Sequence, residues 1–370
     1  MRKLFIIKTL LCFLLLVSLP SGDFLAAGGK GNYPWPIKAP FAIGNLYHTV
    51  LTEPYPYFHH GVDLLARPFT NVYSVSDGDA QLFLDPDDTN HRSGVVVYED
   101  NGLVWLYLHL KPSSITTKLD WMSNRRARVK RGELLGIVAG QIPTFPHLHL
   151  ELWNYHRPVN PMLYLKPLKD TKKPEIGRIH FYKNNSDERM KPGTAGLPVL
   201  YGDVDIVAEV RDWIPPSPYT LTPYRIDYRV EPLDEDSEAR GFRNRPYRFD
   251  TLPGLDKLPM PRNYWGIDPY LLELKGKVFS IFKFSSDSQT YSHFTRRKRR
   301  YFYILTNSMK GKISEEKGYW NTDRKRRGKA VYPDGRYRIT VSAYDYAGNK
   351  GEKSVDVLVE NEESSSESDD

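Results

Sequence analysis

Apolar and polar residues alternate with a period of two in many short runs of this 370-residue chain, whereas apolar residues at helical spacing are scarce. In an extended strand, such alternation turns one face toward a core and the other toward solvent. The 26 Gly and 28 Pro residues break the chain into short segments. The pattern predicts a mainly β protein built from antiparallel sheets, and the chain is long enough for two domains with separate cores.

Residues 1–27 have the pattern of a secretory signal peptide, with basic residues, an apolar stretch and then small residues. We therefore expect an exported protein of the periplasm, envelope or extracellular space; retention as an uncleaved anchor is the alternative. The apolar stretch is short for a membrane span of about 20 residues, so no stable span is expected after cleavage. The only cysteine, Cys12, lies in this segment, which leaves the mature chain without disulfides or thiolate ligands.

The rest of the chain divides at residues 166–175, a segment rich in Lys, Asp and Pro that we expect to be a linker. Residues 28–165 before it are predicted to form one antiparallel sheet domain with a metal groove on one face. Its expected strands lie near residues 71–80, 94–99, 103–109, 134–138 and 148–153.

Residues 176–360 are predicted to form a β-sandwich, because four period-two sets would each bury one face. These sets are Val204/Ile206/Ala208/Val210, Ile226/Tyr228/Val230, Tyr337/Ile339/Val341/Ala343 and Val355/Val357/Val359. The segments Pro333–Tyr337 and Asp345–Asn349 resemble hairpin turns of immunoglobulin-like bacterial surface domains, which implies that kind of sandwich. Residues 231–320 are expected to be a long, partly ordered insertion, and the acidic tail 361–370 is expected to be disordered.

Two motifs far apart in sequence place metal-binding side chains on one face of a strand. In His59-His60-Gly61-Val62-Asp63, residues 59, 61 and 63 share a face and His60 points the other way. In His147-Leu148-His149, both imidazoles project from the face opposite the leucine. A catalytic zinc ion typically takes three protein ligands and keeps a position for water. His59 and Asp63 with one further imidazole would complete such a site, which leaves another imidazole for proton transfer.

A further imidazole, His109, ends the alternating apolar segment 104–110 and is expected to face the same groove. With it, residues from about 40 to 165 resemble the LytM/lysostaphin-type zinc metallopeptidases, which cut peptide bonds in bacterial peptidoglycan. The family pattern is His-x-Gly-x-Asp, then Tyr-x-His, then His-x-His followed by an apolar residue and Glu. It is met at His59/Gly61/Asp63, Tyr107/His109 and His147/His149/Glu151.

The resemblance implies that His59, Asp63 and His149 bind Zn²⁺. It also implies that His109 and His147 flank a zinc-bound water, which would act as the nucleophile. Glu151 and Asp77 are candidate hydrogen-bond partners of the ligand imidazoles. The chain departs from the family at residues 40–45, which lack the Arg of the usual Phe-Gly-x-Arg, and in the short loop 139–146. Both departures bear on which peptide fits the groove.

The formal charge of +7 comes with basic runs at residues 125–128, 296–300 and 324–327. For an exported chain these runs favour anionic envelope polymers over nucleic acid, and solvated loops without a ligand are the alternative. The sequence predicts an exported zinc endopeptidase acting on stem peptides or cross-links of peptidoglycan. Two alternatives are a non-catalytic cell-wall scaffold of the same fold that activates another hydrolase, and an adhesin that binds envelope polymers. The oligomeric state is not readable from the sequence.

Overall fold

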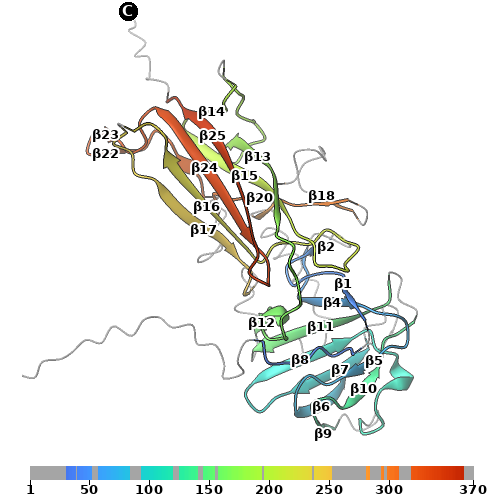
Figure 1. Cartoon of the computed structure of the whole chain (residues 1–370). Helices are drawn as coiled ribbons and strands as arrows, with labels where there is room; N and C mark the ends of the chain where they lie inside the picture. Colours follow the sequence, from blue (N-terminus) through green and yellow to red (C-terminus); the bar gives the residue numbers. More distant parts are fainter. Residues whose placement is uncertain are drawn as a thin grey trace, which may run out of the picture.

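The computed structural model describes residues 31–38, 40–51, 57–83, 93–119, 125–140, 145–154, 157–193, 196–235, 237–251, 281–283, 293–295, 298–307 and 318–361. The predicted signal segment and residues 362–370 lie outside this part. Two bodies follow one another along the chain, both made mainly of antiparallel strands (Figure 1). The prediction of a mainly β protein is confirmed. The described residues form no helix long and apolar enough to cross a bilayer.

The first domain is built on an eight-stranded sheet in the order β1-β4-β11-β8-β7-β6-β9, with β12 paired to β11. Its strands are β1 (Ala42–Ile43), β4 (Gly61–Leu65), β6 (Gly78–Phe83), β7 (Gly94–Tyr98), β8 (Leu103–Leu108), β9 (Ala127–Val129), β11 (His147–Asn154) and β12 (Arg157–Val159). A second sheet pairs β5 (Asn71–Tyr73) with β10 (Leu134–Ile137). The predicted strand 71–80 is therefore two strands, because the chain passes from the small sheet to the large one. The two 3-10 helices are η1 (Pro112–Ser114) and η2 (Pro161–Leu163).

Strand β11 lies between β4 and β8 in this sheet and has two chemically different faces. Leu148, Leu150 and Leu152 are fully buried in the core of the first domain. The residues between them, His149 and Glu151, lie on the opposite face together with His147, because successive side chains of a strand alternate. The apolar face therefore fixes the strand in register and sends a row of polar side chains the other way.

The second domain contains two sheets that share one hydrophobic core. The first sheet has the order β13-β15-β20, with β21 also on β15, and the second has the order β14-β25-β24-β16-β17. The strands are β13 (Glu175–Lys183), β14 (Val199–Leu200), β15 (Asp203–Arg211), β16 (Arg225–Pro232), β17 (Phe242–Arg248), β20 (Phe302–Ile304), β21 (Trp320–Asn321), β24 (Gly335–Tyr344) and β25 (Lys350–Val359). Strands β17 and β20 lie inside segment 231–320, which the sequence suggested as an insertion, and pair with β16 and β15.

Three short ribbons complete the described strands. They are β2 (Val50–Leu51) with β3 (Tyr57–Phe58), β18 (His293–Thr295) with β19 (Lys298–Arg300), and β22 (Lys325–Arg326) with β23 (Lys329–Ala330).

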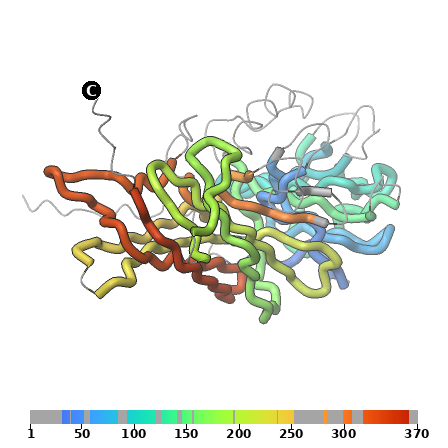
Figure 2. The backbone as a smooth tube through the Cα atoms, turned by 90° about the horizontal axis from the view of Figure 1, so that it is seen from above, coloured from blue at the N-terminus to red at the C-terminus, as the bar shows by residue number. Residues whose placement is uncertain are grey.

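The two domains interleave. Tyr47, Val50 and Phe58, around the β2–β3 ribbon, belong to the hydrophobic core of the second domain. In return, Ile214 and Leu221, from the loop between β15 and β16, pack into the core of the first domain. Figure 1 places β2 beside a yellow loop of the second domain, and in Figure 2 blue segments of the first domain lie beside an orange segment of the second. The start of β4 is thus anchored by the second domain.

Candidate metal centre

Three side chains on neighbouring parts of the large sheet bring their ligand atoms together. Asp63 of β4 lies directly opposite His149 of β11 in the antiparallel register, and His59 precedes β4. Asp63 Oδ1 is 2.8 Å from His149 Nδ1 and 3.0 Å from His59 Nε2. The two imidazole nitrogens are 2.9 Å apart. The three atoms therefore form a nearly equilateral triangle, and all three residues are buried.

This donor set fits a zinc ion. Two imidazole nitrogens and one carboxylate oxygen are ligands that zinc accepts, and three protein ligands leave a position open. Tetrahedral bonds of about 2.1 Å would hold ligand atoms about 3.4 Å apart, so the triangle has to widen by only about half an ångström.

The charges of the cluster also favour a cation. Burial acts to lower the pKa of His149, but its hydrogen bonds to Asp63 and Glu151 raise that pKa to about 10. Burial likewise acts to raise the pKa of Asp63, but His59, His147 and His149 hold it well below its usual value. Without an ion, the cluster retains a proton strongly, and a divalent cation would take the place of that proton.

Each imidazole is oriented by a second hydrogen bond. His59 Nδ1 donates to the carbonyl oxygen of Leu46 at 3.1 Å, which leaves Nε2 with its lone pair toward the centre. His149 Nε2 donates to Glu151 Oε1 at 2.9 Å, which leaves Nδ1 as the ligand atom. The indole of Trp153 donates to the other oxygen of Glu151 at 2.8 Å. A chain of hydrogen bonds thus fixes the ring of His149 from behind.

Gly61 is required by the same arrangement. It lies opposite Glu151 in the pairing of β4 with β11. A Cβ atom at this position would lie 2.4 Å from the carbonyl oxygen of Leu150 and 3.0 Å from the ring of His149. Any side chain here would push the strand or the ligand imidazole out of place.

The two imidazoles predicted to flank the centre both lie beside it. The rings of His109 and His147 are 4.6 Å apart, and the ring of His109 is 6.0 Å from that of His149. His147 Nδ1 donates to the carbonyl oxygen of Phe145 at 2.7 Å, and its Nε2 is 3.7 Å from Asp63 Oδ1. The lone pair of His147 Nε2 therefore faces the centre.

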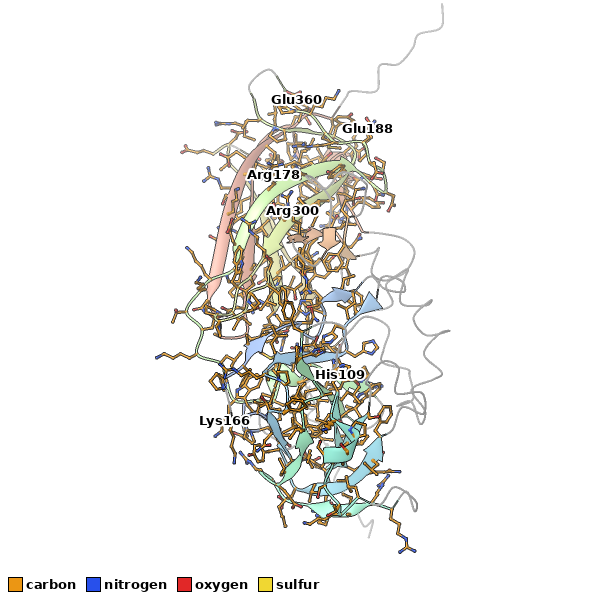
Figure 3. All side chains as sticks on the ribbon, turned by 90° about the vertical axis from the view of Figure 1, so that its right-hand side faces the viewer. His109, Lys166, Arg178, Glu188, Arg300 and Glu360 are labelled. Atoms are coloured by element: carbon orange, nitrogen blue, oxygen red, sulfur yellow. The ribbon has the colours of Figure 1, made fainter. Side chains whose placement is uncertain are left out.

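His109 has an unusual backbone conformation. It follows β8 with a φ of 66°, in the left-handed region that non-glycine residues seldom occupy. Its carbonyl accepts a hydrogen bond from Ala139 N at 2.8 Å, which holds this turn. Figure 3 places His109 in the part of the first domain that faces the second. Strain of this kind concentrates at functional sites.

The structure separates the two predicted hydrogen-bond partners and adds a third. Glu151 bonds to His149, whereas Asp77 is on the surface, where Lys130 and the amide of Arg131 hold it. Asp77 was therefore a wrong prediction for this role. Asn45, which sequence reasoning missed, donates its amide to Asp63 Oδ2. It lies in segment 40–45, where the chain departs from the expected pattern, and that departure was the available signal.

The second domain supplies neighbours of the centre. The guanidinium of Arg299 lies over the ring of Tyr219, 5.0 Å from its centroid, and an Nη1 atom of Arg299 donates to the carbonyl of Gly44 at 3.4 Å. The ring of Tyr219 is 6.1 Å from that of Phe145, whose own carbonyl orients His147. Aromatic and cationic groups of the second domain therefore border the candidate site.

Part of the chain is similar to known peptidases. Residues 57–161 match Peptidase family M23. The chain is 26% identical over 179 residues to "DD-carboxypeptidase/endopeptidase Mpg" of Neisseria meningitidis serogroup B, and a protein of that name from Neisseria gonorrhoeae matches equally. The match covers 45% of this chain and 39% of the relative, so the chain spans about two fifths of the curated relatives' length.

Solved structures are similar over part of the chain. A zinc-containing peptidase from Vibrio cholerae is 22% identical, with a TM-score of 0.29, over 37% of this chain and 41% of its own. The catalytic domain of lysostaphin from Staphylococcus simulans is 21% identical, with a TM-score of 0.25, over 34% of this chain and 90% of its own.

Proposed function

We propose that this chain, with its M23 peptidase domain, is an exported zinc-dependent endopeptidase that hydrolyses peptide bonds in peptidoglycan stem peptides or cross-links. The observation that carries the proposal is the meeting of His59, Asp63 and His149 within 3.0 Å, beside two further imidazoles. The family match and the name of the Neisseria relatives support a peptidase, and the signal-like N-terminus supports export.

His59, Asp63 and His149 would hold the ion. When bound, zinc supplies a Lewis acid that polarises a peptide carbonyl and activates water at neutral pH. His147 is oriented to take up the proton of the attacking water, because its Nδ1 is committed to Phe145 and its Nε2 faces the centre.

His109 lies beside His147 and approaches the centre from another strand. From there it would donate a hydrogen bond to the oxygen on which negative charge develops, and would protonate the leaving amine. The pair thus covers both proton movements that amide hydrolysis needs. Tyr219 and Arg299 of the second domain would contact the peptide substrate, since both border the site. The basic surface suits an anionic wall polymer.

The test compares the chain from residue 28 onward with three variants: His149→Ala, His109→Ala and His147→Ala. Zinc content is measured by mass spectrometry, and so are the peptides released from purified peptidoglycan and from defined muropeptides. We expect about one zinc per chain in the parent and little in His149→Ala. His109→Ala and His147→Ala should keep the metal and lose about 10²–10⁴-fold in kcat.

The alternatives give different results in the same experiment. A zinc-loaded parent chain that releases no peptide would refute the endopeptidase and favour a scaffold that activates another hydrolase. Tight binding to cell wall without any cleavage, unchanged in His149→Ala, would favour the polymer-binding adhesin.

A further inference from the structure

Three aspartates from distant parts of the sequence converge where the linker reaches the second domain. Asp170 lies in the linker, Asp212 directly follows β15 and Asp345 directly follows β24. One carboxylate oxygen of each lies within 4.8 Å of those of the other two. Strands β15 and β24 belong to different sheets, so the cluster joins both sheets to the linker. In Figure 1 the adjoining end of β24 points toward the first domain.

Two of the three aspartates are buried, and no cation lies against Asp212 among the described residues. Asp212 is 0% exposed and Asp345 is 2% exposed. Among the described residues, both carboxylate oxygens of Asp212 and Oδ2 of Asp170 are buried without a hydrogen bond of ordinary geometry, although the backbone of Trp213 lies close enough to lower the pKa of Asp212. The charged groups that act on Asp212 are Asp345 and Asp170, both of the same sign. Within the described residues, Asp212 is therefore a buried acid whose carboxylate lies close to two others and lacks a hydrogen bond of ordinary geometry.

Physical chemistry allows few solutions for such a group. A buried carboxylate without a partner is strongly unfavourable, so it either takes up a proton or binds a cation. Burial, followed by the charges of Asp345 and Asp170, raises the pKa of Asp212 to about 7. A single proton on Asp212 would still leave its two neighbours charged and close together. A divalent cation compensates all three at once.

We propose that Asp170, Asp212 and Asp345 form a binding site for a divalent cation, and that the ion is Ca²⁺. The donors are carboxylate oxygens only, and calcium binds six to eight oxygen atoms in a flexible geometry. Zinc and other borderline metals favour nitrogen or sulfur, which this cluster does not offer.

The neighbouring turn holds the ligands in place before an ion arrives. Asn349 donates its backbone N–H to Asp345 Oδ1 at 2.8 Å and its side-chain amide to Asp345 Oδ2 at 2.7 Å. The same amide group donates to the carbonyl oxygen of Asp170 at 3.1 Å. Turn 345–349 therefore ties the linker to the end of β24 and presents Asp345 in a fixed orientation.

The position of the site gives the ion a structural role. A cavity of about 230 Å³ lies between the two domains, lined among others by Met162, Asp170, Ile214 and Tyr346. A cation bound at Asp170 would close this junction by fixing the linker against both sheets. We infer that calcium stiffens the connection between the peptidase domain and the second domain, independently of the zinc centre.

The test uses the chain from residue 28 onward, stripped of metal and reloaded with Zn²⁺ so that the His59 group is saturated. Tb³⁺ shares the oxygen preference of Ca²⁺, and a nearby indole sensitises its luminescence; Trp213 is next to Asp212. We expect Tb³⁺ luminescence that Ca²⁺ displaces, and a rise of several degrees in Tm with Ca²⁺. Titration to about 10 mM covers the Kd range of extracellular calcium modules, about 10⁻⁴–10⁻³ M.

Two variants and one control make the result specific. Asp212→Asn and Asp170→Asn should each lose the luminescence and the calcium-dependent Tm shift. In calcium-free buffer, Asp212→Asn should be at least as stable as the parent, because the amide removes a buried charge and can donate to the neighbouring carboxylates. A misfolded variant would instead be less stable. Asp356→Asn, which changes an exposed partner of Arg338, should keep the full response.

The proposal fails if the parent chain shows neither luminescence nor a Tm shift over this range. It also fails if Asp212→Asn and Asp170→Asn respond to Ca²⁺ as the parent does. Both results are independent of whether the chain hydrolyses peptidoglycan.

Discussion

His48 makes the contact between the two domains sensitive to acid. Its side chain is fully buried, and its ring stacks on Phe249 of the second domain with centroids 3.5 Å apart and planes within 5°. In the part of the chain that the structure describes, neither ring nitrogen of His48 has a hydrogen-bond partner of ordinary geometry. Burial lowers the pKa of His48 from 6.5 to about 3, and the nearby carbonyl of Pro223 offsets only part of this. The folded protein therefore keeps His48 neutral.

The sign and size of the effect follow from proton linkage. Above pH 6.5 the residue is neutral in both states and stability does not depend on its titration. Below pH 6.5 the unfolded chain binds a proton that the folded chain does not, so stability falls until the pH reaches about 3. The loss should be about 1.4 kcal/mol at pH 5.5 and about 2.7 kcal/mol at pH 4.5.

The variant His48→Phe keeps an aromatic ring against Phe249 and removes the titration. We would measure urea unfolding of both metal-free proteins by tryptophan fluorescence at pH 7.5, 5.5 and 4.5. Metal-free protein avoids the release of ligands from the zinc centre in acid. Any difference in packing between His48 and Phe is the same at every pH and cancels when the pH values are compared. The difference in the free energy of unfolding between the two proteins should therefore change by the amounts above, in favour of the variant.

A parallel loss of stability in parent and variant between pH 7.5 and 4.5 would refute this reasoning. Phe249→Leu serves as the control, because it loses the stacked ring but keeps His48. It should be less stable than the parent at every pH and retain the pH dependence of the parent.

Three further predictions concern single contacts. Glu151→Gln places an amide against the indole N–H of Trp153 and weakens the hydrogen bond that orients His149. Zinc affinity, measured by competition with a chelator, should therefore fall about 10–100-fold. An unchanged affinity would show that Glu151 does not position His149. Gly61→Ala should lower zinc content and Tm, because the added Cβ would lie 2.4 Å from the carbonyl oxygen of Leu150. Gly136→Ala should be tolerated, because the nearest atom to its added Cβ would be the hydroxyl oxygen of Ser114 at 3.3 Å. Arg300→Met removes both 2.8 Å hydrogen bonds to the buried Glu209 and should lower the free energy of unfolding by about 3–5 kcal/mol, against less than about 1 kcal/mol for the exposed Arg338→Met.

The strands and the convergence of His59, Asp63 and His149 were predictable because both depend on short-range patterns. Alternation places His149 on the polar face of β11 and its leucine neighbours in the core, whatever the rest of the chain does. Asn45 was not predictable in this way, since its contact with Asp63 depends on how a loop returns to the sheet. Arg300 is similar: its basic run suggested a solvated or polymer-binding surface, but its side chain neutralises Glu209 on β15.

The aspartate cluster lies beyond what local patterns can reveal. Asp170, Asp212 and Asp345 are single acids at the ends of separate segments, and each looks like an ordinary turn residue in the sequence. They come together because β15 and β24 belong to two different sheets that pack on one shared core. Sites assembled from three such segments require the tertiary fold before they become visible.

Residues of each domain pack into the hydrophobic core of the other, which affects how the candidate metal centre can be tested. His59 follows Phe58, whose ring lies 6.3 Å from that of Phe282, and Phe58 is fully buried in the core of the second domain. A chain cut at the linker would expose Phe58 with Val50 and Tyr47, and it would lose Ile214 and Leu221 from its own core. Because a ligand residue is adjacent to the exposed surface, such a fragment would misplace His59 for reasons unrelated to catalysis. The second domain therefore supports the position of His59 in the candidate metal centre, and its contribution is better measured by substitutions in the full chain than by its removal.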